Sequence, residues 1–338
     1  MTEPGEAVNI APFNAHSGRG QLPQGEEWAQ TTVVVLGLDE IGFSEADALL
    51  DLGARVHVVA LEDSDVARDR AAVLEALDAH VSWDGVLPTC DLVFVGGAVA
   101  ATSPLIAEAL ARGVPMWADI DLAWNLDGGR TPWLGVTGPE SAQAALALES
   151  ILVCAGLRTS AVGAGLRPII ETCLDDETYD VLAVRLDATQ LHWMSPISFH
   201  SACVTGVNAD DDLSDVAKVY DQVQQCAVYR VEEPATETMV EEADVVEGAR
   251  AIGITCTVPA ISMLGVVDGL LVDRAFIPQR YDSALELVSV SAWGDLPAVA
   301  ALAAAALARS VPVPPTAVRV GLSEDKRKEM VPISGEER

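Results

Sequence analysis

The sequence predicts an α/β protein made of two units, each built on a mainly parallel sheet. Its 338 residues correspond to two domains at roughly 150 residues per domain. Half of the residues are hydrophobic and only 5% are aromatic, a mixture that suits helices packed on buried strands. Short β-branched runs alternate with helical patterns, and one such run in each half ends in a glycine turn. Alternation of this kind is typical of α/β folds.

The first unit is expected over residues 30–127 as a Rossmann-like domain. A continuous apolar run at 31–36 ends at Gly37, a helical pattern follows through Leu52, and the next strand is expected at 55–59. This strand–turn–helix–strand order opens a parallel α/β domain. The same pattern then predicts a strand at 91–95, a helix at 104–112 and a strand at 114–118, and the sequence at 127–130 indicates a linker.

The second unit is expected over residues 128–322. A strand at 133–138 leads into a helix at about 140–155, which is the order of a P-loop-like domain. Asp268-Gly269 between two apolar runs predicts a hairpin over 266–272. The remaining expected elements are strands near 159–162, 181–186, 202–205 and 227–231, and a final helix at about 297–310.

Both ends of the chain are expected to be disordered. Residues 1–29 are rich in Gly, Pro and Glu, and they carry neither the basic nor the apolar region of a signal peptide. Residues 323–338 are charged and show no apolar period. We therefore predict an acidic tail at the start and a flexible tail at the end.

The charge and the cysteines restrict the partners and the compartment. A net charge of −31 disfavours nucleic acid and anionic membranes, and serves either solubility or a basic partner. No apolar run approaches the roughly 20 residues of a membrane helix, so no membrane insertion is expected. The six cysteines form no CxxC pair, which favours a reducing compartment without a zinc site. These features predict a cytoplasmic protein.

The first glycine turn is a candidate binding site for the pyrophosphate of a UDP-type substrate. Gly37, Leu38 and Gly42 lie where a strand feeds a helix, so backbone amides there suit an anion, and Ser44 would add a hydroxyl donor. The spacing differs from the GxGxxG fingerprint, and Ala60 follows the second strand where an acidic ribose ligand is expected. A tight turn that needs glycine explains the same residues, and both interpretations stand.

The second glycine turn is a degenerate candidate for cofactor binding. Thr137, Gly138 and Gln143 lie where a phosphate loop would bind ATP. Such a loop needs a lysine followed by a hydroxyl residue, but Ala142 takes the place of the lysine, and Glu140 adds negative charge. We therefore expect this loop not to hold ATP in the usual way.

Few other residues suggest chemistry. Asp210, Asp211 and Asp212 could bind a divalent cation, although such runs are usually solvated loops. The histidines show no ligand spacing, and no serine lies in a GxSxG turn.

Three stretches, at 33–44 with 53–56, at 104–124 and at 264–276, make the chain similar to the Mur ligases, above all to their D-glutamate-adding branch. The resemblance covers about residues 28–331. It implies a first domain that binds the UDP part of the substrate, a second that binds ATP, and a third that helps to bind the amino acid. The family forms an acyl phosphate that the amine attacks. This chain ends where the third domain would begin, so we expect the C-terminal ligase domain to be absent.

The departures from the family fall on its functional positions. The phosphate-loop lysine falls on Ala142, the magnesium-binding glutamate on Arg185, the histidine of an Asp-His-Leu-Asp motif on Asp212, and a carbamylated lysine near Gln224. A Ser-Ser pair falls on Asp187 and Ala188, an asparagine on Ala164, and a His-Asn pair on Leu296 and Pro297. The resemblance therefore predicts that neither ATP nor magnesium is bound and that no catalytic residue remains.

Our main functional hypothesis is a non-catalytic homologue linked to peptidoglycan precursor synthesis. It would bind UDP-N-acetylmuramoyl-L-alanine or a protein partner such as an active Mur ligase. The first alternative is an active ATP-dependent ligase with an altered site or one completed by another chain. The second is a purely structural, protein-binding scaffold.

Overall fold

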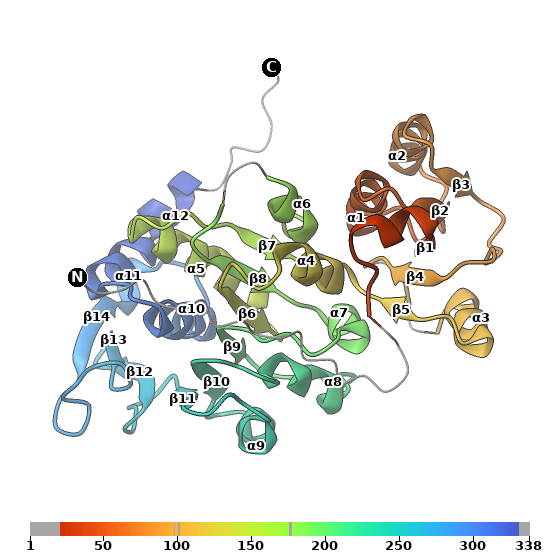
Figure 1. The fold of residues 1–338 in the computed structure, drawn as a ribbon. Helices are drawn as coiled ribbons and strands as arrows, with labels where there is room; N and C mark the ends of the chain where they lie inside the picture. Colours follow the sequence, from red (N-terminus) through yellow and green to blue (C-terminus); the bar gives the residue numbers. More distant parts are fainter. Residues whose placement is uncertain (1–20, 98, 101, 176–177, 331–338) are drawn as a thin grey trace, which may run out of the picture.

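A computed structural model describes residues 21–330 apart from 98, 101, 176 and 177, and it contains two sheets (Figure 1). The first sheet has the order β3-β2-β1-β4-β5, and all its pairs are parallel. Its strands are β1 Thr32–Leu36, β2 Arg55–Val59, β3 His80–Ser82, β4 Leu92–Val95 and β5 Met116–Trp117. The β-branched run of β1 is fully buried at its centre, as a central strand covered on both faces requires.

The second sheet has the order β14-β13-β12-β11-β10-β9-β6-β8-β7. The strands from β7 to β12 pair in parallel, and β13 and β14 extend the sheet in antiparallel fashion. The strands are β6 Trp133–Thr137, β7 Ala161–Gly163, β8 Leu182–Arg185, β9 Ser201–Val204, β10 Cys226–Arg230, β11 Arg250–Ile254, β12 Met263–Val267, β13 Leu270–Asp273 and β14 Leu285–Ser289.

The helices cover both sheets. Those of the first unit are η1 Gly25–Gln30, α1 Glu40–Asp51, α2 Asp65–Ala76, α3 Pro104–Arg112 and α4 Asp119–Asp127. Those that follow β6 are α5 Ser141–Cys154, α6 Ile169–Leu174, α7 Ala188–Trp193, α8 Leu213–Ala217, η2 Lys218–Tyr220, α9 Pro234–Glu242, η3 Val290–Ala292, α10 Ala298–Ser310, α11 Pro315–Gly321 and α12 Glu324–Met330. Within the described residues, no helix is long and apolar enough to cross a membrane.

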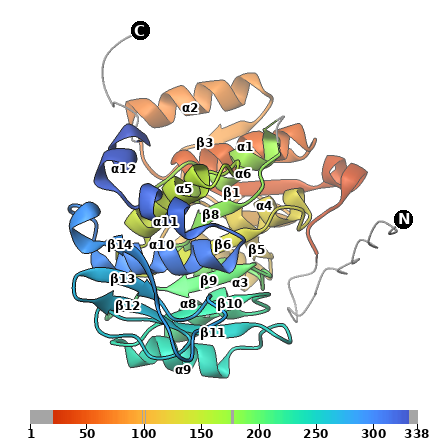
Figure 2. The same ribbon diagram turned by 90° about the vertical axis from the view of Figure 1, so that its left-hand side faces the viewer.

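The second sheet separates two hydrophobic cores. Alternate residues of β8 face opposite sides, so Leu182 and Val184 join one core while Ala183 joins the other. The core of Ala183 is closed by α5, α10 and α11, which lie together on one face of the sheet in Figure 2. The core of Leu182 continues into the first sheet, so the two units share a hydrophobic interior.

Helix α10 is unusual because ten consecutive residues, Val299–Ala308, are buried. It packs against α5 on one side and β9, β10 and β11 on the other. Seven of these ten residues are alanines, and their small side chains let α10 fit between a helix and a sheet.

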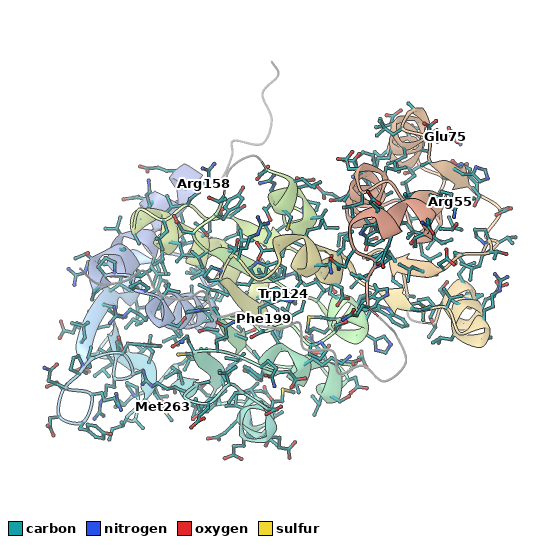
Figure 3. The ribbon with its side chains drawn as sticks, in the orientation of Figure 1. Arg55, Glu75, Trp124, Arg158, Phe199 and Met263 are labelled. Atoms are coloured by element: carbon teal, nitrogen blue, oxygen red, sulfur yellow. The ribbon has the colours of Figure 1, made fainter. Side chains whose placement is uncertain are left out.

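Helix α4 connects the last strand of the first sheet to the first strand of the second. Its Trp124 ring lies 4.8 Å from the Trp133 ring of β6, edge to face, and Phe199 continues this aromatic group, as Figure 3 shows at the centre of the molecule. A Cβ on Gly135 would lie 3.0 Å from the Phe199 ring, so a glycine in β6 makes room for the aromatic side chain.

The predicted α/β class with two parallel-sheet units is confirmed, and so is the hairpin at 266–272, where Asp268 and Gly269 both have positive φ. Two stretches within the predicted tails are ordered instead. Residues 25–30 form η1 with a buried Trp28, because this side chain contributes to the core, and residues 324–330 form α12. Residues 1–20 and 331–338 lie outside the described residues.

Candidate functional site

The turn between β6 and α5 has a backbone that only glycine can provide. Gly138 has φ +95°, and a Cβ there would lie 2.4 Å from the Gly206 carbonyl oxygen and 2.8 Å from the Thr205 hydroxyl. The left-handed conformation and the close approach both exclude a side chain. The turn after β6 is therefore packed directly on the turn after β9.

Two threonines fix this turn to its neighbours. The Thr137 hydroxyl donates to the Leu186 carbonyl oxygen at 3.0 Å, beyond the end of β8. The Thr205 hydroxyl lies 2.9 Å from the Thr137 carbonyl oxygen and also contacts that of Pro139. The carboxyl ends of β6, β8 and β9 are thereby joined at one edge, where ligands bind in open α/β sheets.

Arg185, at the end of β8, lies against this turn. Its Nε donates to the Ser141 hydroxyl at 3.2 Å, and its Nη1 donates to the Ala164 carbonyl oxygen. Ser141 is the first residue of α5 and is buried. The guanidinium therefore lies beside the amino end of a 14-residue helix, and the structure brings together three positions, 142, 164 and 185, at which the sequence departs from the family.

Arg230, at the end of β10, supplies a second positive charge at the same edge, and sequence reasoning missed it. Its Nη1 lies 3.5 Å from the Thr205 carbonyl oxygen and its Nε 3.7 Å from the Glu232 carboxylate. Burial raises the pKa of Glu232, but hydrogen bonds from Thr255 and Cys256 and the charge of Arg230 outweigh it, so the pKa lies below its usual value. The arginine that ends the apolar run of β10, Cys226–Tyr229, is the signal that could have revealed it.

The positions where the resemblance placed the cofactor site do not all lie at this edge of the sheet. Gln143 is exposed and Ala142 half-buried in the first turn of α5, and Glu140, with φ 64°, is exposed just before it. Gln224 precedes β10, and its amide donates to Ser198, so it lies at the opposite edge of the sheet from Gly138. Gln224, near which a carbamylated lysine of the family falls, is thus separated from the loop by the direction of the strand.

The residues present do not fit magnesium in the manner of the family. Asp212 accepts hydrogen bonds from the Ser214 amide and hydroxyl, which lower its pKa, and Asp187 caps α7 by accepting from the Gln190 amide. By the resemblance described above, Arg185 falls where the family has a carboxylate ligand. In the part of the chain that the structure describes, no group of three or more His, Cys, Asp or Glu side chains could hold a metal ion. The positive charge of Arg185 and Arg230 does fit an anion such as a phosphate group.

The Gly37 turn shows the packing that a tight turn requires. A Cβ on Gly42 would lie 2.5 Å from the Gly37 carbonyl oxygen, and the Gly42 amide already donates to the Asp39 carboxylate at 2.8 Å. Leu38 and Ser44 are both buried. The four predicted substrate-binding residues therefore belong to one turn and the helix start. The glycines allow the backbone to pack closely there, and the Asp39 side chain occupies the helix N-terminus.

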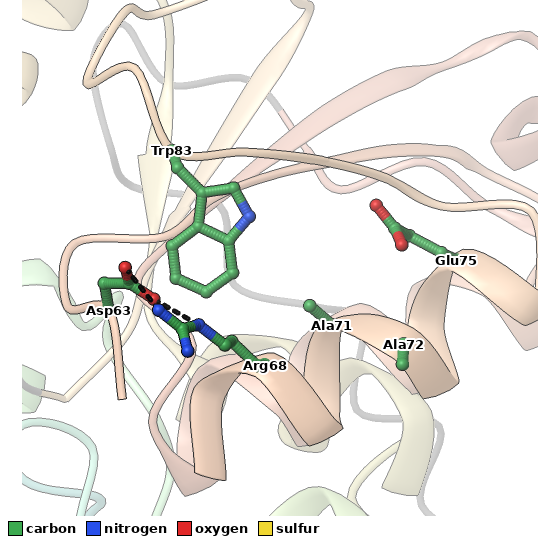
Figure 4. A pocket seen from close by; sticks show the side chains of 6 residues that line it. All are labelled: Asp63, Arg68, Ala71, Ala72, Glu75 and Trp83. Carbon is green, nitrogen blue, oxygen red and sulfur yellow. Dashed lines mark hydrogen bonds and ion pairs between the residues drawn. The ribbon is translucent and has the colours of Figure 1, made fainter. Parts of the chain in front are cut away.

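A separate shallow pocket of about 380 Å³ lies on α2, away from all predicted site residues. Figure 4 shows Trp83 facing the ion pair of Asp63 and Arg68, whose nearest atoms are 2.7 Å apart. Ala71, Ala72 and Glu75 complete its lining. Arg68 and Asp63 are largely exposed, so solvent screens this pair.

Known proteins similar to this chain are peptidoglycan ligases. The UDP-N-acetylmuramoylalanine–D-glutamate ligase of Streptomyces avermitilis is 43% identical over 316 residues, which cover 87% of this chain and 67% of the relative. That of Streptomyces coelicolor is 42% identical, with 88% and 67% covered. The chain thus spans about two thirds of the length of these relatives. No protein-family model matches the chain.

Solved structures show the same fold at low sequence identity. The UDP-N-acetylmuramate:L-alanyl-γ-D-glutamyl-meso-diaminopimelate ligase of Neisseria meningitides superposes with a TM-score of 0.54 at 14% identity, covering 86% of this chain and 97% of that one. The UDP-N-acetylmuramate–alanine ligase of Thermotoga maritima gives 0.52 at 15% identity, covering 87% and 68%.

These relatives correct the main functional prediction. The sequence hypothesis of a non-catalytic homologue is contradicted, since relatives at up to 43% identity carry the name of a ligase and nothing among them indicates an inactive branch. The alternative of an active ligase fits better. The three stretches that carry the resemblance agree with the fold and with a relative that is 43% identical over 87% of the chain. The chain belongs to the Mur ligase family.

Proposed function

We propose that the chain acts in the ATP-dependent joining of D-glutamate to UDP-N-acetylmuramoyl-L-alanine, with an altered phosphate site. The identity of 43% to a ligase of this name carries the proposal. Arg185 and Arg230 supply positive charge at the loop where the sequence lacks the family's lysine. The chain spans about two thirds of the length of this relative. The predicted cytoplasmic location belongs to the same proposal.

The residues of this chain have defined tasks in such a reaction. ATP would supply the phosphoryl group that activates the substrate carboxylate. The fixed turn at Gly138 and the first amides of α5 orient an anion, and Arg185 stabilises negative charge that builds up there. That the Gly37 turn binds the UDP part, that the Gly138 loop does not hold ATP in the usual way and that a protein partner exists remain predictions.

The first prediction concerns Arg185. We expect Arg185→Gln to lower kcat/KM for ADP formation by about 100-fold, because a preorganised donor to developing charge is lost. The measurement is ADP release with ATP, UDP-N-acetylmuramoyl-L-alanine and D-glutamate, at several magnesium concentrations. Arg68→Gln, which removes an exposed arginine on α2, is the matched control and should leave the rate unchanged.

Two results would contradict the proposed function. One is the absence of substrate-dependent ADP formation by the wild-type chain. The other is activity that survives in the Arg185→Gln variant at the wild-type level, which would place the anion elsewhere. Calorimetric titration of UDP-N-acetylmuramoyl-L-alanine without ATP separately tests whether the first unit binds the precursor.

A further inference from the structure

Glu45 of α1 is a buried carboxyl group without a partner. Its side chain is 0% exposed, and neither carboxyl oxygen has a hydrogen-bond partner in the described structure. An ionised carboxylate in such a place carries a large desolvation cost. A protonated carboxyl avoids most of that cost, so the geometry favours a neutral Glu45.

Two further carboxyl groups lie close to Glu45 on α4. Asp119 and Asp121 are 1% and 5% exposed. The Gln190 amide of α7 donates to both oxygens of Asp119, at 2.8 and 3.0 Å, and the Ser195 amide donates to Asp121 at 2.8 Å. The carboxylates of α4 are thus held by donors from the second unit, while Glu45 faces them from the first.

The remaining charged groups on elements packed against α1 do not neutralise this group. Arg70 of α2 donates to the Leu38 carbonyl oxygen, and Arg55 of β2 to that of Gln30. Glu171 of α6 is negatively charged and raises the pKa of Asp47, on another part of α1. The second titratable group of β2, His57, packs edge to face on His80 of β3, and burial lowers its pKa.

Burial and neighbouring carboxylates raise the proton affinity of Glu45 and of Asp119, on which Asp187 and Asp121 act. Burial raises the pKa of Glu45 well above its usual value, and the charges of Asp119, Asp39 and Asp121 raise it further. Burial also raises the pKa of Asp119 to about 7, against the hydrogen bond from Gln190, which lowers it. Asp39 adds its charge from the turn before α1.

We propose that Glu45, Asp119 and Asp121 form a proton-dependent lock between α1 of the first unit and α4, which α7 of the second unit holds in place. With a proton on Glu45 the junction is closed and dry. Loss of that proton places like charges together in a buried interface, and the junction opens so that water reaches them. Figure 1 shows α4 between α1 and the second sheet, so this opening moves the Gly37 turn relative to the Gly138 turn.

The direction of the pH dependence follows from linkage. A carboxyl group whose pKa is raised on folding binds more protons in the closed state than in the open or unfolded state. The contribution of this group to the stability of the closed state is therefore complete below its pKa in the unfolded chain. It is lost as the pH rises through its raised pKa in the closed state. The closed junction is expected to be stable at pH 6 and weakened at pH 9.

Hydrogen exchange of the full chain tests the lock. Protection factors, corrected for intrinsic exchange, are measured at pH 6 and pH 9 for the amides of α1, α4 and α10. In the wild type we expect protection in α1 and α4 to fall at least about tenfold, the equivalent of one pKa unit, while α10 keeps its protection. In Glu45→Gln the fall should be at least about threefold smaller than in the wild type.

Matched variants keep the test decisive. Glu75→Gln makes the same change at an exposed glutamate of α2 and should behave as the wild type. If Glu45→Gln fails to fold, Asp119→Asn removes a second proton-binding group and should also reduce the fall. A flat wild-type profile, or a fall as large as that of the wild type in either folded variant, would overturn the lock, and neither result depends on ligase activity.

Discussion

Replacement of Gly138 with alanine is expected to lower the free energy of unfolding by about 4 kcal/mol, because a left-handed residue and a backbone clash are combined. The new Cβ would lie 2.4 Å from the Gly206 carbonyl oxygen, so the turn after β6 or the turn after β9 must move. Such a shift separates Arg230 from the loop, and any activity at this edge should be lost with it.

Gly156 provides the matched control for this substitution. It also has a positive φ, +80°, but a Cβ there meets no atom within 4 Å. Gly156→Ala should therefore cost only about 1 kcal/mol, the conformational strain alone. Urea unfolding of both variants measures the difference. Equal midpoints for the two variants would show that the contact with Gly206 does not constrain the turn.

Replacement of Asp273 with alanine is expected to destabilise the chain by about 3–5 kcal/mol, as loss of one partner from a buried ion pair does. Asp273 is fully buried, and its carboxylate lies 3.1 Å from Nε of Arg309 on α10. The same carboxylate accepts from the Ala275 and Phe276 amides, at 2.7 and 2.8 Å. The substitution leaves a buried guanidinium and two amides without their acceptor.

The exposed ion pair of Asp63 and Arg68 is the control for the buried pair of Asp273 and Arg309. Both side chains are about 60% exposed, so Asp63→Ala should lower the free energy of unfolding far less than Asp273→Ala does. Thermal and urea unfolding of Asp273→Ala and Asp63→Ala, each beside the wild type, measure the two values. A loss below about 1 kcal/mol for Asp273→Ala would mean that neighbouring groups compensate for the missing carboxylate.

The elements that could be predicted are those marked by residues within or next to the element itself. The strands at 32–36, 55–59 and 92–95 and the helix at 104–112 were found within two residues, because β-branched runs and terminal glycines mark them. Helix α4 was missed, since acidic residues that look exposed in the sequence are buried at the junction. Strands β11 and β14 depend on pairing with distant neighbours, which no local period reveals.

The site was predicted in part. The Gly138 turn follows from a strand that ends in glycine before a helix, but the approach of Arg185 to Ser141 joins residues 44 positions apart in the sequence. Arg230 reaches the same edge from a strand that is not adjacent to β6. The absence of the family's functional residues was interpreted as absence of activity. The positive charges that Arg185 and Arg230 supply from other strands cannot be placed at this edge from the sequence alone.

The burial of α10 on all sides has a mechanical consequence. Helix α10 is enclosed between α5 and the sheet, so it has no room to rotate about its axis or to accept a bulkier residue. This layer is therefore rigid. The two units meet on the opposite face of the sheet, where Gln190 of α7 bonds to Asp119 of α4. We expect relative motion of the units to take place there, while α10 fixes the spacing of β9, β10 and β11.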